Sequence, residues 1–317
     1  MALHLVPRSL VYVEAVAEHG SVQGASRAIG IAASAIDRQI VLVEERLGVR
    51  LFDRMTTGMA LSPAGEMFVV LARRWRADEN RIWSEVKKMQ GVDLGHIRLV
   101  TMDSQVNGTI PRFLARVAAD YPKVRIDVEV ATPDEAVVAL DDGRADIALA
   151  FNVRPQRAIH LIWSEQLPLI CVVAPTHPLA GHGGTSLQEV RGYPLVLQSR
   201  ALAIRRILEE RHAPMVSDGS PPVVTNSLQL LKQLAVAGTH IALTSEIDAA
   251  PEILDGRLTA IPVKDKSLAR QSISVAISSQ RTLPSICRIV ADALVAEAES
   301  CLAAVRSFRG GAAPDSS

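Results

Sequence analysis

The chain has 317 residues, of which 48% are hydrophobic, 21% charged and 3% aromatic, and its formal net charge at pH 7 is zero. This length exceeds one typical domain, and the apolar content is enough for two or three folded units. Zero net charge argues against a protein that coats nucleic acid without specificity. The chain shows no membrane-length apolar run, no signal-peptide core and no close pair among its three cysteines. We therefore expect a cytoplasmic protein that has no disulfide framework and does not bind membranes.

Three short helices are predicted within the first fifty residues. Apolar residues at helical spacing predict a helix that ends before Gly20, and Ser21 is placed to cap a second helix over 22–29. A third helix carries an apolar stripe that begins at Ile36 and ends before Gly48. Two short helices joined by a tight turn, the second exposing polar residues at its start, are typical of a helix-turn-helix that enters the DNA major groove.

A hairpin is predicted after the third helix. Its strands are residues 49–52 and 59–61, and Thr57 and Gly58 lie at its turn. Such a hairpin beside a helix-turn-helix would form a wing.

A long helix is predicted over 63–90, with Ser62 as its N-cap and a proline in its first turn. Its apolar residues fall seven positions apart, at Phe68, Trp75, Ile82 and Met89. This spacing is typical of a dimerising coiled coil. Acidic residues interrupt the second seam position, however, and an ordinary core-facing helix gives a similar pattern. Periodicity alone leaves both interpretations open.

Strands and helices alternate in the remaining two-thirds, beyond a predicted hinge at 91–95. The predicted strands are 97–101, 125–130, 146–151, 169–174, 195–197, 223–224, 241–243 and 273–277, with helices around 110–117 and over 133–140, 228–237 and 283–299. This alternation predicts a largely parallel sheet covered on both faces. The final residues are mostly Gly, Ala, Pro and Ser, which favours a disordered tail, placed at 303–317.

An ordered set of motifs between Tyr12 and Glu66 resembles the DNA-binding region of LysR-type transcriptional regulators, without a gap. The motifs are Glu14-Ala15-Val16-Ala17-Glu18-His19-Gly20-Ser21, Gly24-Ala25-Ser26-Arg27-Ala28, Ser34-Ala35-Ile36-Asp37-Arg38-Gln39-Ile40, Glu44-Glu45-Arg46-Leu47-Gly48-Val49-Arg50-Leu51-Phe52-Asp53-Arg54 and Leu61-Ser62-Pro63-Ala64-Gly65-Glu66. A single helix-turn-helix pattern is weak evidence, but this order of motifs is specific.

Softer matches in the second part resemble the effector domain of the same family, which is similar to a periplasmic substrate-binding protein. They are Gly95-x-Ile97-Arg98-Leu99, Leu140-Asp141-Asp142-Gly143-Arg144-Ala145-Asp146-Ile147-Ala148, Thr176-His177-Pro178-Leu179-Ala180 and Gly238-Thr239-His240-Ile241-Ala242-Leu243. The resemblance implies an α/β multidomain fold with a mostly α winged helix-turn-helix, a long linker helix and a two-lobed α/β effector domain. The implied boundaries are 1–62 for the DNA-binding domain, 63–90 for the linker and dimerisation helix, and 95–302 for the effector domain. Lobe I would take about 95–165 and 268–302, and lobe II about 166–267, with chain crossovers near 161–166 and 266–271.

The same resemblance implies the function. It is a sequence-specific DNA-binding transcriptional regulator whose promoter binding or activation responds to a small-molecule effector held between the two lobes. A homodimer or homotetramer on promoter DNA, and contact with RNA polymerase, are the implied partners. No cofactor or metal is implied, and the chain is not expected to be an enzyme.

Eight residues are predicted to contact DNA, in the third helix, the helix before it and the wing. They are Arg27, Ala33, Ser34, Ala35, Asp37, Arg38, Gln39 and Arg54. Arginine suits a guanine edge and glutamine an adenine edge, which fits Arg38 and Gln39. Arg38 could equally bind only phosphate.

Asp37 departs from the family pattern, because many relatives have a small hydroxyl residue there and an acid repels phosphate. Relatives also usually have serine and glutamine where this chain has Ala32 and Ala33. In one interpretation Ser34-x-x-Asp37 is a capping box and the helix begins about two residues later than in relatives. In the other, Asp37 accepts a hydrogen bond from cytosine N4.

Nine residues are predicted to contact the effector, because they follow the carboxyl ends of strands, where such folds bind ligands. They are Thr101, Met102, Asp103, Ser104, Asn152, Ser199, Arg200, Thr225 and Ser227, with Gln198 and Asn226 beside them. Hydroxyls, helix-start N–H groups and Arg200 suit a carboxylate, whereas Met102 and Asp103 suit an amine or a ring. Loops also contain such residues simply because they turn the chain.

Three other functions were weighed. The chain lacks the glycine-rich, nucleophile-elbow and metalloprotease motifs of common enzyme classes, and its histidines lack metal-ligand spacing. A free-standing solute-binding protein does not fit a fused helix-turn-helix. Redox sensing through Cys171 conflicts with its place in an apolar run, where a buried inert thiol is expected.

Overall fold

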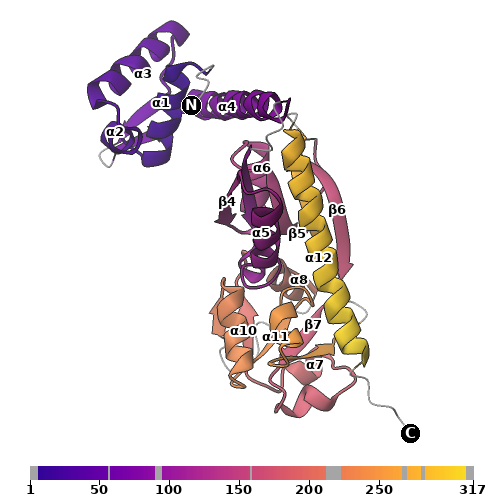
Figure 1. Ribbon diagram of the computed structural model, residues 1–317. Coiled ribbons are helices and arrows are strands. Elements are labelled where there is room, and N and C mark those ends of the chain that lie inside the picture. The colour runs from indigo at the N-terminus through magenta and orange to yellow at the C-terminus, as the bar shows by residue number, and fades with distance from the viewer. Residues whose placement is uncertain are drawn as a thin grey trace. The chain divides into compact units, whose positions relative to one another are not determined.

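The computed structural model describes residues 6–55, 58–89, 95–157, 159–211, 223–265, 270–279 and 283–311, and the chain forms two compact units (Figure 1). The first unit contains the chain up to Gly95 with two short later segments, 142–144 and 281–285, and the second contains the rest. Apart from Gly95, the predicted hinge lies outside the described residues. Among the helices that the structure describes, none combines the length and the apolar character needed to cross a bilayer.

The first unit is a bundle of helices with a two-stranded hairpin. Its elements are α1 (Arg8–His19), α2 (Val22–Ile29), α3 (Ala33–Leu47), β1 (Phe52–Met55), β2 (Gly58–Leu61) and α4 (Pro63–Met89). The predicted apolar faces form its core, in which Leu10, Val13, Val16, Ile36 and Ile40 are buried. Ser21 caps α2 as predicted, because its hydroxyl accepts the N–H of Gly24 at 3.0 Å.

The first strand of the hairpin is shorter than predicted. β1 begins at Phe52 rather than at Val49. The N–H groups of Leu51 and Phe52 are taken up by the carboxylate of Glu44 on α3, at 2.7 and 3.3 Å. These two N–H groups, which the sequence-based prediction placed in a strand, thus bond to a side chain of the neighbouring helix. Residues 56–57, at the predicted turn, lie outside the described residues.

α4 begins as predicted after Ser62, whose hydroxyl accepts the N–H of Gly65 at 3.1 Å. Phe68, the first residue of the seven-residue repeat, packs against the core of the first unit. The later members Trp75, Ile82 and Met89 are exposed. The repeat therefore contributes to the core only at its start, and the rest is an uncovered apolar stripe on the chain.

Two five-stranded sheets organise the second unit. The first has the order β4-β3-β5-β12-β6 and consists of β3 (Gly95–Thr101), β4 (Val124–Val130), β5 (Ile147–Phe151), β6 (Ile159–Leu167) and β12 (Gln271–Ser278). The second has the order β11-β7-β10-β8-β9 and consists of β7 (Ile170–Val173), β8 (Leu195–Gln198), β9 (Val223–Thr225), β10 (Ile241–Thr244) and β11 (Thr259–Pro262).

Both sheets are mixed, so the prediction of a largely parallel sheet was wrong. β3 is parallel to β5, and β10 and β9 are parallel to β8. β12, however, is antiparallel to both β5 and β6, and β7 is antiparallel to both β10 and β11. The antiparallel strands carry the chain into and out of the second sheet, and alternation along the sequence does not reveal their direction.

The chain passes between the two sheets immediately after β6. The segment predicted as the first crossover, 161–166, is part of β6 and pairs with β12, and the passage follows at Pro168 and Leu169. Most of the second predicted crossover lies outside the described residues. We call the part built on the first sheet the first lobe and the part built on the second sheet the second lobe.

Helices and short turns flank the two sheets. They are η1 (Asp103–Gln105), α5 (Thr109–Asp120), α6 (Pro133–Asp141), η2 (Pro178–Gly181), α7 (Leu187–Val190), α8 (Ala203–Arg211), α10 (Leu228–Val236), α11 (Ala250–Leu254) and α12 (Ser285–Gly311). α5, α6 and most of α12 belong to the first lobe, and α7, α8, α10 and α11 to the second (Figure 1).

α12 extends far beyond the predicted helix, so the prediction of disorder from residue 303 was wrong as far as Gly311. Val305 is buried, and Arg306 pairs with Glu246 at 2.7 Å and with Glu165 at 2.9 Å. Arg309 also pairs with Glu246, at 3.1 Å. These contacts with both lobes hold a segment whose composition alone favours disorder. Residues 312–317 lie outside the described residues.

A buried ion pair lies where the two lobes meet. Lys232 on α10 and Glu252 on α11 are 3.2 Å apart, and both side chains are 0% exposed. The ammonium of Lys232 also donates to the backbone oxygen of Asp248 at 3.0 Å and to the side-chain oxygen of Asn107, in the first lobe, at 2.9 Å. Burial lowers the pKa of Lys232, although the charge of Glu252 opposes this shift. Removing one partner of such a pair strongly destabilises the fold, because it leaves an unpaired buried charge.

We expect Lys232→Ala to lower the free energy of unfolding by about 3–5 kcal/mol, because it leaves a buried carboxylate at Glu252 without its cation. The double variant Lys232→Met with Glu252→Leu should regain much of this loss, because it removes both charges and keeps apolar volume. Urea unfolding of the full chain, followed by far-ultraviolet circular dichroism, measures both.

Arg116→Ala is the matched control, since it breaks an exposed pair with Asp120 at 3.8 Å in which both side chains are 55% exposed. It should change the stability by less than about 1 kcal/mol. A Lys232→Ala variant no less stable than this control would show that the buried pair does not hold the lobe together.

Candidate nucleic-acid interface and ligand cavity

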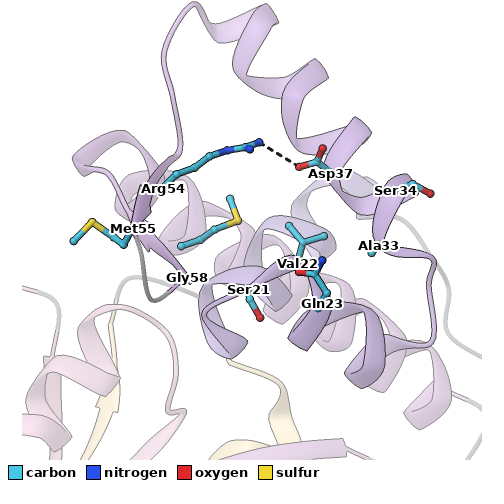
Figure 2. A pocket seen from close by; sticks show the side chains of 10 residues that line it. Ser21, Val22, Gln23, Ala33, Ser34, Asp37, Arg54, Met55 and Gly58 are labelled. Carbon is cyan, nitrogen blue, oxygen red and sulfur yellow. Dashed lines mark ion pairs between the residues drawn. The ribbon is translucent and has the colours of Figure 1, made fainter.

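A hollow of about 440 Å³ lies on the first unit between α2, α3 and the hairpin. It is lined by Ser21, Val22, Gln23, Ala33, Ser34, Asp37, Arg54, Met55, Gly58 and Met59. Figure 2 shows Arg54 reaching from the hairpin across the hollow towards Asp37 on α3. The starts of α2 and α3 and the hairpin therefore line one hollow.

Four of the eight residues predicted to contact DNA line this hollow, namely Ala33, Ser34, Asp37 and Arg54. The other four do not line it. Of these, Arg27, Ala35 and Arg38 are exposed and Gln39 is half-buried. Sequence reasoning missed the residues contributed by the start of α2 and, apart from Arg54, those contributed by the hairpin. Gln23, a polar residue in the first turn of α2, offered a signal that could have been used.

Asp37 does not cap α3, so the capping-box interpretation was wrong. α3 begins at Ala33, its N-cap is Ala32, and no side chain caps it. The helix start is held by backbone bonds, in which Ala35 and Ile36 donate to the oxygen of Ala32 at 2.9 and 3.2 Å. The late helix start that the capping box required is therefore absent.

Asp37 instead forms an ion pair with Arg54. The closest oxygen and nitrogen are 3.7 Å apart, and the side chains are 48% and 71% exposed. At this exposure such a pair contributes about 0–1 kcal/mol, so a DNA phosphate could displace the carboxylate. The pair directs Arg54 towards α3, and an exposed guanidinium is suited to a phosphate or a groove edge. Reading of cytosine by Asp37 stays a prediction.

A second candidate site lies between the two lobes of the second unit. The cavity there is lined by Met102, Pro133, Phe151, Gln198, Leu202, Ala203, Leu228, Asp248 and Gln271. Its free volume is about 20 Å³, which accommodates about one water molecule. Any larger ligand must therefore move the lobes or displace side chains.

The buried carboxylate of this cavity is Asp248. It accepts hydrogen bonds from Ser245 at 2.8 Å, from Thr244 at 3.1 Å and from the Gln105 amide of the first lobe at 3.2 Å. Burial raises the pKa of Asp248, and the surrounding donors oppose the shift. Asp248 thus gives the cavity a concentrated negative charge or, when protonated, a donor.

The predicted effector residues are distributed unevenly around this cavity. Met102 lines it, and Thr101 and Ser104 are buried beside it. Asp103 bonds to Ser227 across the lobes, as described below. Sequence reasoning missed Asp248 and, apart from Met102, the apolar lining, because these residues come from elements far apart in the chain.

The other predicted effector residues have partners within the protein. Asn152, at φ 53°, accepts the N–H of Ser272 at 2.9 Å. The side chain of Arg200 is 81% exposed and pairs with Glu209 at 2.9 Å. The Thr225 hydroxyl accepts the N–H of Ser227 at 3.0 Å. Ser199 differs, because its buried hydroxyl has no hydrogen-bond partner among the described residues.

Redox chemistry at Cys171 is not supported by its surroundings. The side chain is buried in β7, and burial raises its pKa to about 12. Cys287 and Cys301 are also buried. The described residues contain no group of three or more His, Cys, Asp and Glu side chains arranged to hold a metal ion.

Comparison with known families decides the assignment. Residues 7–66 match the family model described as "Bacterial regulatory helix-turn-helix protein, lysR family", and residues 90–299 match "LysR substrate binding domain". The chain belongs to the LysR family. It is a transcriptional regulator with a helix-turn-helix DNA-binding domain and an effector-binding domain, as the motifs predicted.

Relatives of the same family align over most of the chain. An uncharacterised HTH-type transcriptional regulator of Mycobacterium tuberculosis H37Rv is 28% identical over 267 residues, which cover 81% of this chain and 86% of the relative. The HTH-type transcriptional regulator CbbR of Sinorhizobium medicae is 26% identical over 288 residues, covering 88% and 89%. These relatives are named as regulators of transcription rather than as enzymes.

Solved structures show the same fold. ArgP from Mycobacterium tuberculosis has a TM-score of 0.64 at 17% identity, and the alignment covers 93% of this chain and 98% of ArgP. Full-length CbnR in complex with its target DNA has a TM-score of 0.58 at 19% identity, with coverages of 93% and 99%. The LysR-type fold of an N-terminal helix-turn-helix and a C-terminal mixed α/β domain is thereby confirmed.

For the DNA-binding surface we expect Arg54→Ala to weaken binding to specific and unrelated duplexes alike, because it removes an exposed cation that is predicted to contact the DNA backbone. The slope of log affinity against log salt concentration should become shallower by about one. Fluorescence anisotropy titration at several salt concentrations measures this.

Asp37→Asn should have the opposite effect, since it removes the carboxylate that competes for Arg54. We expect binding up to about fivefold tighter on every duplex, corresponding to ~1 kcal/mol. A change confined to one base pair of the operator would contradict this and would show that Asp37 reads cytosine.

Proposed function

We propose that this LysR-family regulator binds a dyad-symmetric promoter site as a homodimer or homotetramer and acts in the cytoplasm. We propose further that a small molecule bound between the lobes changes the arrangement of the DNA-binding domains, and with it DNA bending and contact with RNA polymerase. The observation that carries the proposal is the surface formed by α2, α3 and the hairpin, with Arg54 directed towards α3. A recognition helix beside a hairpin that carries an exposed arginine supports entry into a major groove with backbone contacts on its flank.

The apolar stripe on α4 supports a dimer. Met67, Leu71, Trp75, Ile82, Val86 and Met89 are all exposed, at 41% to 86%. They follow one another at intervals of three, four or seven residues, so they share one face of the helix. Exposed apolar surface of this kind marks a protein contact, and a second α4 has a matching stripe.

The small size of the cavity supports a ligand-dependent change of conformation. A cavity with room for about one water cannot admit an effector in the closed arrangement. The effector would therefore bind one arrangement of the lobes more tightly than the other, which is the requirement for allosteric control.

The DNA-binding proposal is tested by titrating the full chain onto labelled DNA from upstream of its own gene, with an unrelated duplex as control. We expect preference for the upstream DNA by about 10³ or more, and affinity that falls steeply with salt. Equal and weak binding to both duplexes would contradict promoter binding at that site.

The dimer is tested by Ile82→Glu, which places a charge within the apolar stripe. We expect it to shift the chain to monomers in sedimentation velocity and to reduce specific DNA affinity. The matched control is Asn80→Glu, which adds the same charge at an exposed position of α4 outside the stripe. A dimer that survives Ile82→Glu at the concentration where the control is dimeric would rule out this interface.

A further inference from the structure

We propose that Asp103 is a built-in anionic ligand of the second lobe, and that the cavity between the lobes takes a small neutral or cationic polar molecule rather than a carboxylate or phosphate. This inference rests on the proposed function, because it names the chemical class of effector for the same cavity. Four observations carry it, and they concern the N-terminus of α10, the location of the cations, an unpaired polar atom and the charge of Asp248.

The N-terminus of α10 is already occupied by a carboxylate. Asp103, on η1 of the first lobe, accepts the hydroxyl hydrogen bond of Ser227 and the backbone N–H of Gln229, each at 3.0 Å. The Gln229 amide also donates to the backbone oxygen of Asp103 at 2.9 Å. Free N–H groups and the helix dipole make the start of a helix a binding place for anions. In this protein a side chain from the opposite lobe fills that place, and it joins the lobes as it does so.

No cation is left to receive an anionic effector in the described part of the cavity. Its lining contains one carboxylate, two glutamines and otherwise apolar groups. Arg200, which the sequence placed at this site, points to Glu209 and is largely exposed. Lys232 is fully buried and is held by Glu252, Asn107 and the backbone of Asp248. An anion entering the cavity would lose its hydration without gaining a counter-charge.

The cavity does contain a polar atom that lacks a partner. The side-chain nitrogen of Gln271, a residue that lines the cavity and is 4% exposed, has no hydrogen-bond partner among the described residues. Buried polar groups are normally satisfied, so this donor points to a ligand with an acceptor.

Asp248 sets the charge that the ligand can carry. Asp248 lines the cavity, and burial raises its pKa. A second negative charge would oppose it, whereas an amide or ammonium group would form a hydrogen bond with it. Once the lobes or side chains have moved to admit such a molecule, the apolar residues Met102, Phe151 and Leu228 would face its body. The arrangement selects a small amide, alcohol or amine with an apolar part.

The test is chemical rescue with acetate, which replaces the carboxylate of Asp103, and acetamide, which has the same shape without the charge. In Asp103→Ala the start of α10 becomes free, so the melting temperature of the full chain should fall. Acetate should then restore at least half of the loss in a saturable manner, relative to chloride at equal ionic strength, and acetamide should not. The wild type should show no saturable response to acetate. Asp120→Ala, which removes an exposed carboxylate at the end of α5, should also show none.

Several outcomes would overturn the proposal. One is a saturable acetate response in the wild type, which would mean that an anion site is still open. Another is the lack of rescue in a folded Asp103→Ala variant, or equal rescue by acetate and acetamide. If Asp103→Ala does not fold, Ser227→Ala keeps the carboxylate and one of its two donors. It should then melt lower than the wild type without responding to acetate, and an acetate response would count against the proposal.

The readout is independent of DNA, so failure of this inference is distinguishable from failure of the proposed function. Promoter binding without acetate rescue would leave the regulator and overturn only the proposal for Asp103 and the cavity. Acetate rescue without promoter binding would leave the contact between Asp103 and the start of α10 and overturn the regulatory role.

Discussion

Buried polar groups join the two lobes, and the behaviour of the effector-binding unit depends on how they are satisfied. Asp103, Gln105 and Asn107 extend from η1 and the turn after it, and each bonds to the second lobe. Their partners include a lysine and two carboxylates that have almost no exposure to solvent. Because an unpaired buried charge is costly, these bonds are made together or released together. The lobes are therefore suited to discrete arrangements rather than to gradual opening.

Burial gives two ion pairs of this chain different roles. Lys232 and Glu252 are 0% exposed, so neither charge has water as an alternative partner, and the pair is structural. Asp37 and Arg54 are about half or more exposed, so the pair contributes little to stability and exchanges readily with solvent ions. The second kind is what a DNA-binding surface requires, because the arginine is oriented before contact and is released at little cost when a phosphate arrives.

Features set by local sequence were predictable, and features set by distant partners were not. The cap at Ser21, the start of α4 after Ser62 and the buried stripe of α3 depend on residues within a few positions of each other. The family followed from ordered motifs in the same region. By contrast, the partner of Asp37 comes from the hairpin, and the helical end of the chain is held through Glu246. Charge alone does not reveal which of several opposite charges will be near.

In the ligand cavity, too, the location was predictable from local sequence, whereas the chemistry depends on residues far apart in the chain. The carboxyl ends of β3 and β8 were predictable places for a ligand, and Met102 and Gln198 do line the cavity there. The chemistry of the cavity, however, depends on Asp248, which follows β10, and on Gln271, which begins β12. It also depends on Asp103 and Arg200, which bond to Ser227 and Glu209 instead of lining the cavity. Residue types in loops thus locate the site, whereas the pairing among those residues determines what the site can bind.

Ligand binding and closure of the lobes are consequently coupled, because a ligand shifts the balance between the closed and the open arrangement. The closed arrangement keeps the bonds of Asp103 but leaves the side-chain nitrogen of Gln271 without a partner among the described residues. Because this arrangement has room for about one water molecule, a larger ligand that keeps the Asp103 bonds must displace side chains, and one that breaks those bonds favours opening. Each tenfold difference in its affinity for the two forms shifts the balance by about 1.4 kcal/mol. The sign of the effector's action on the lobes is therefore set by whether it is compatible with the carboxylate at the start of α10.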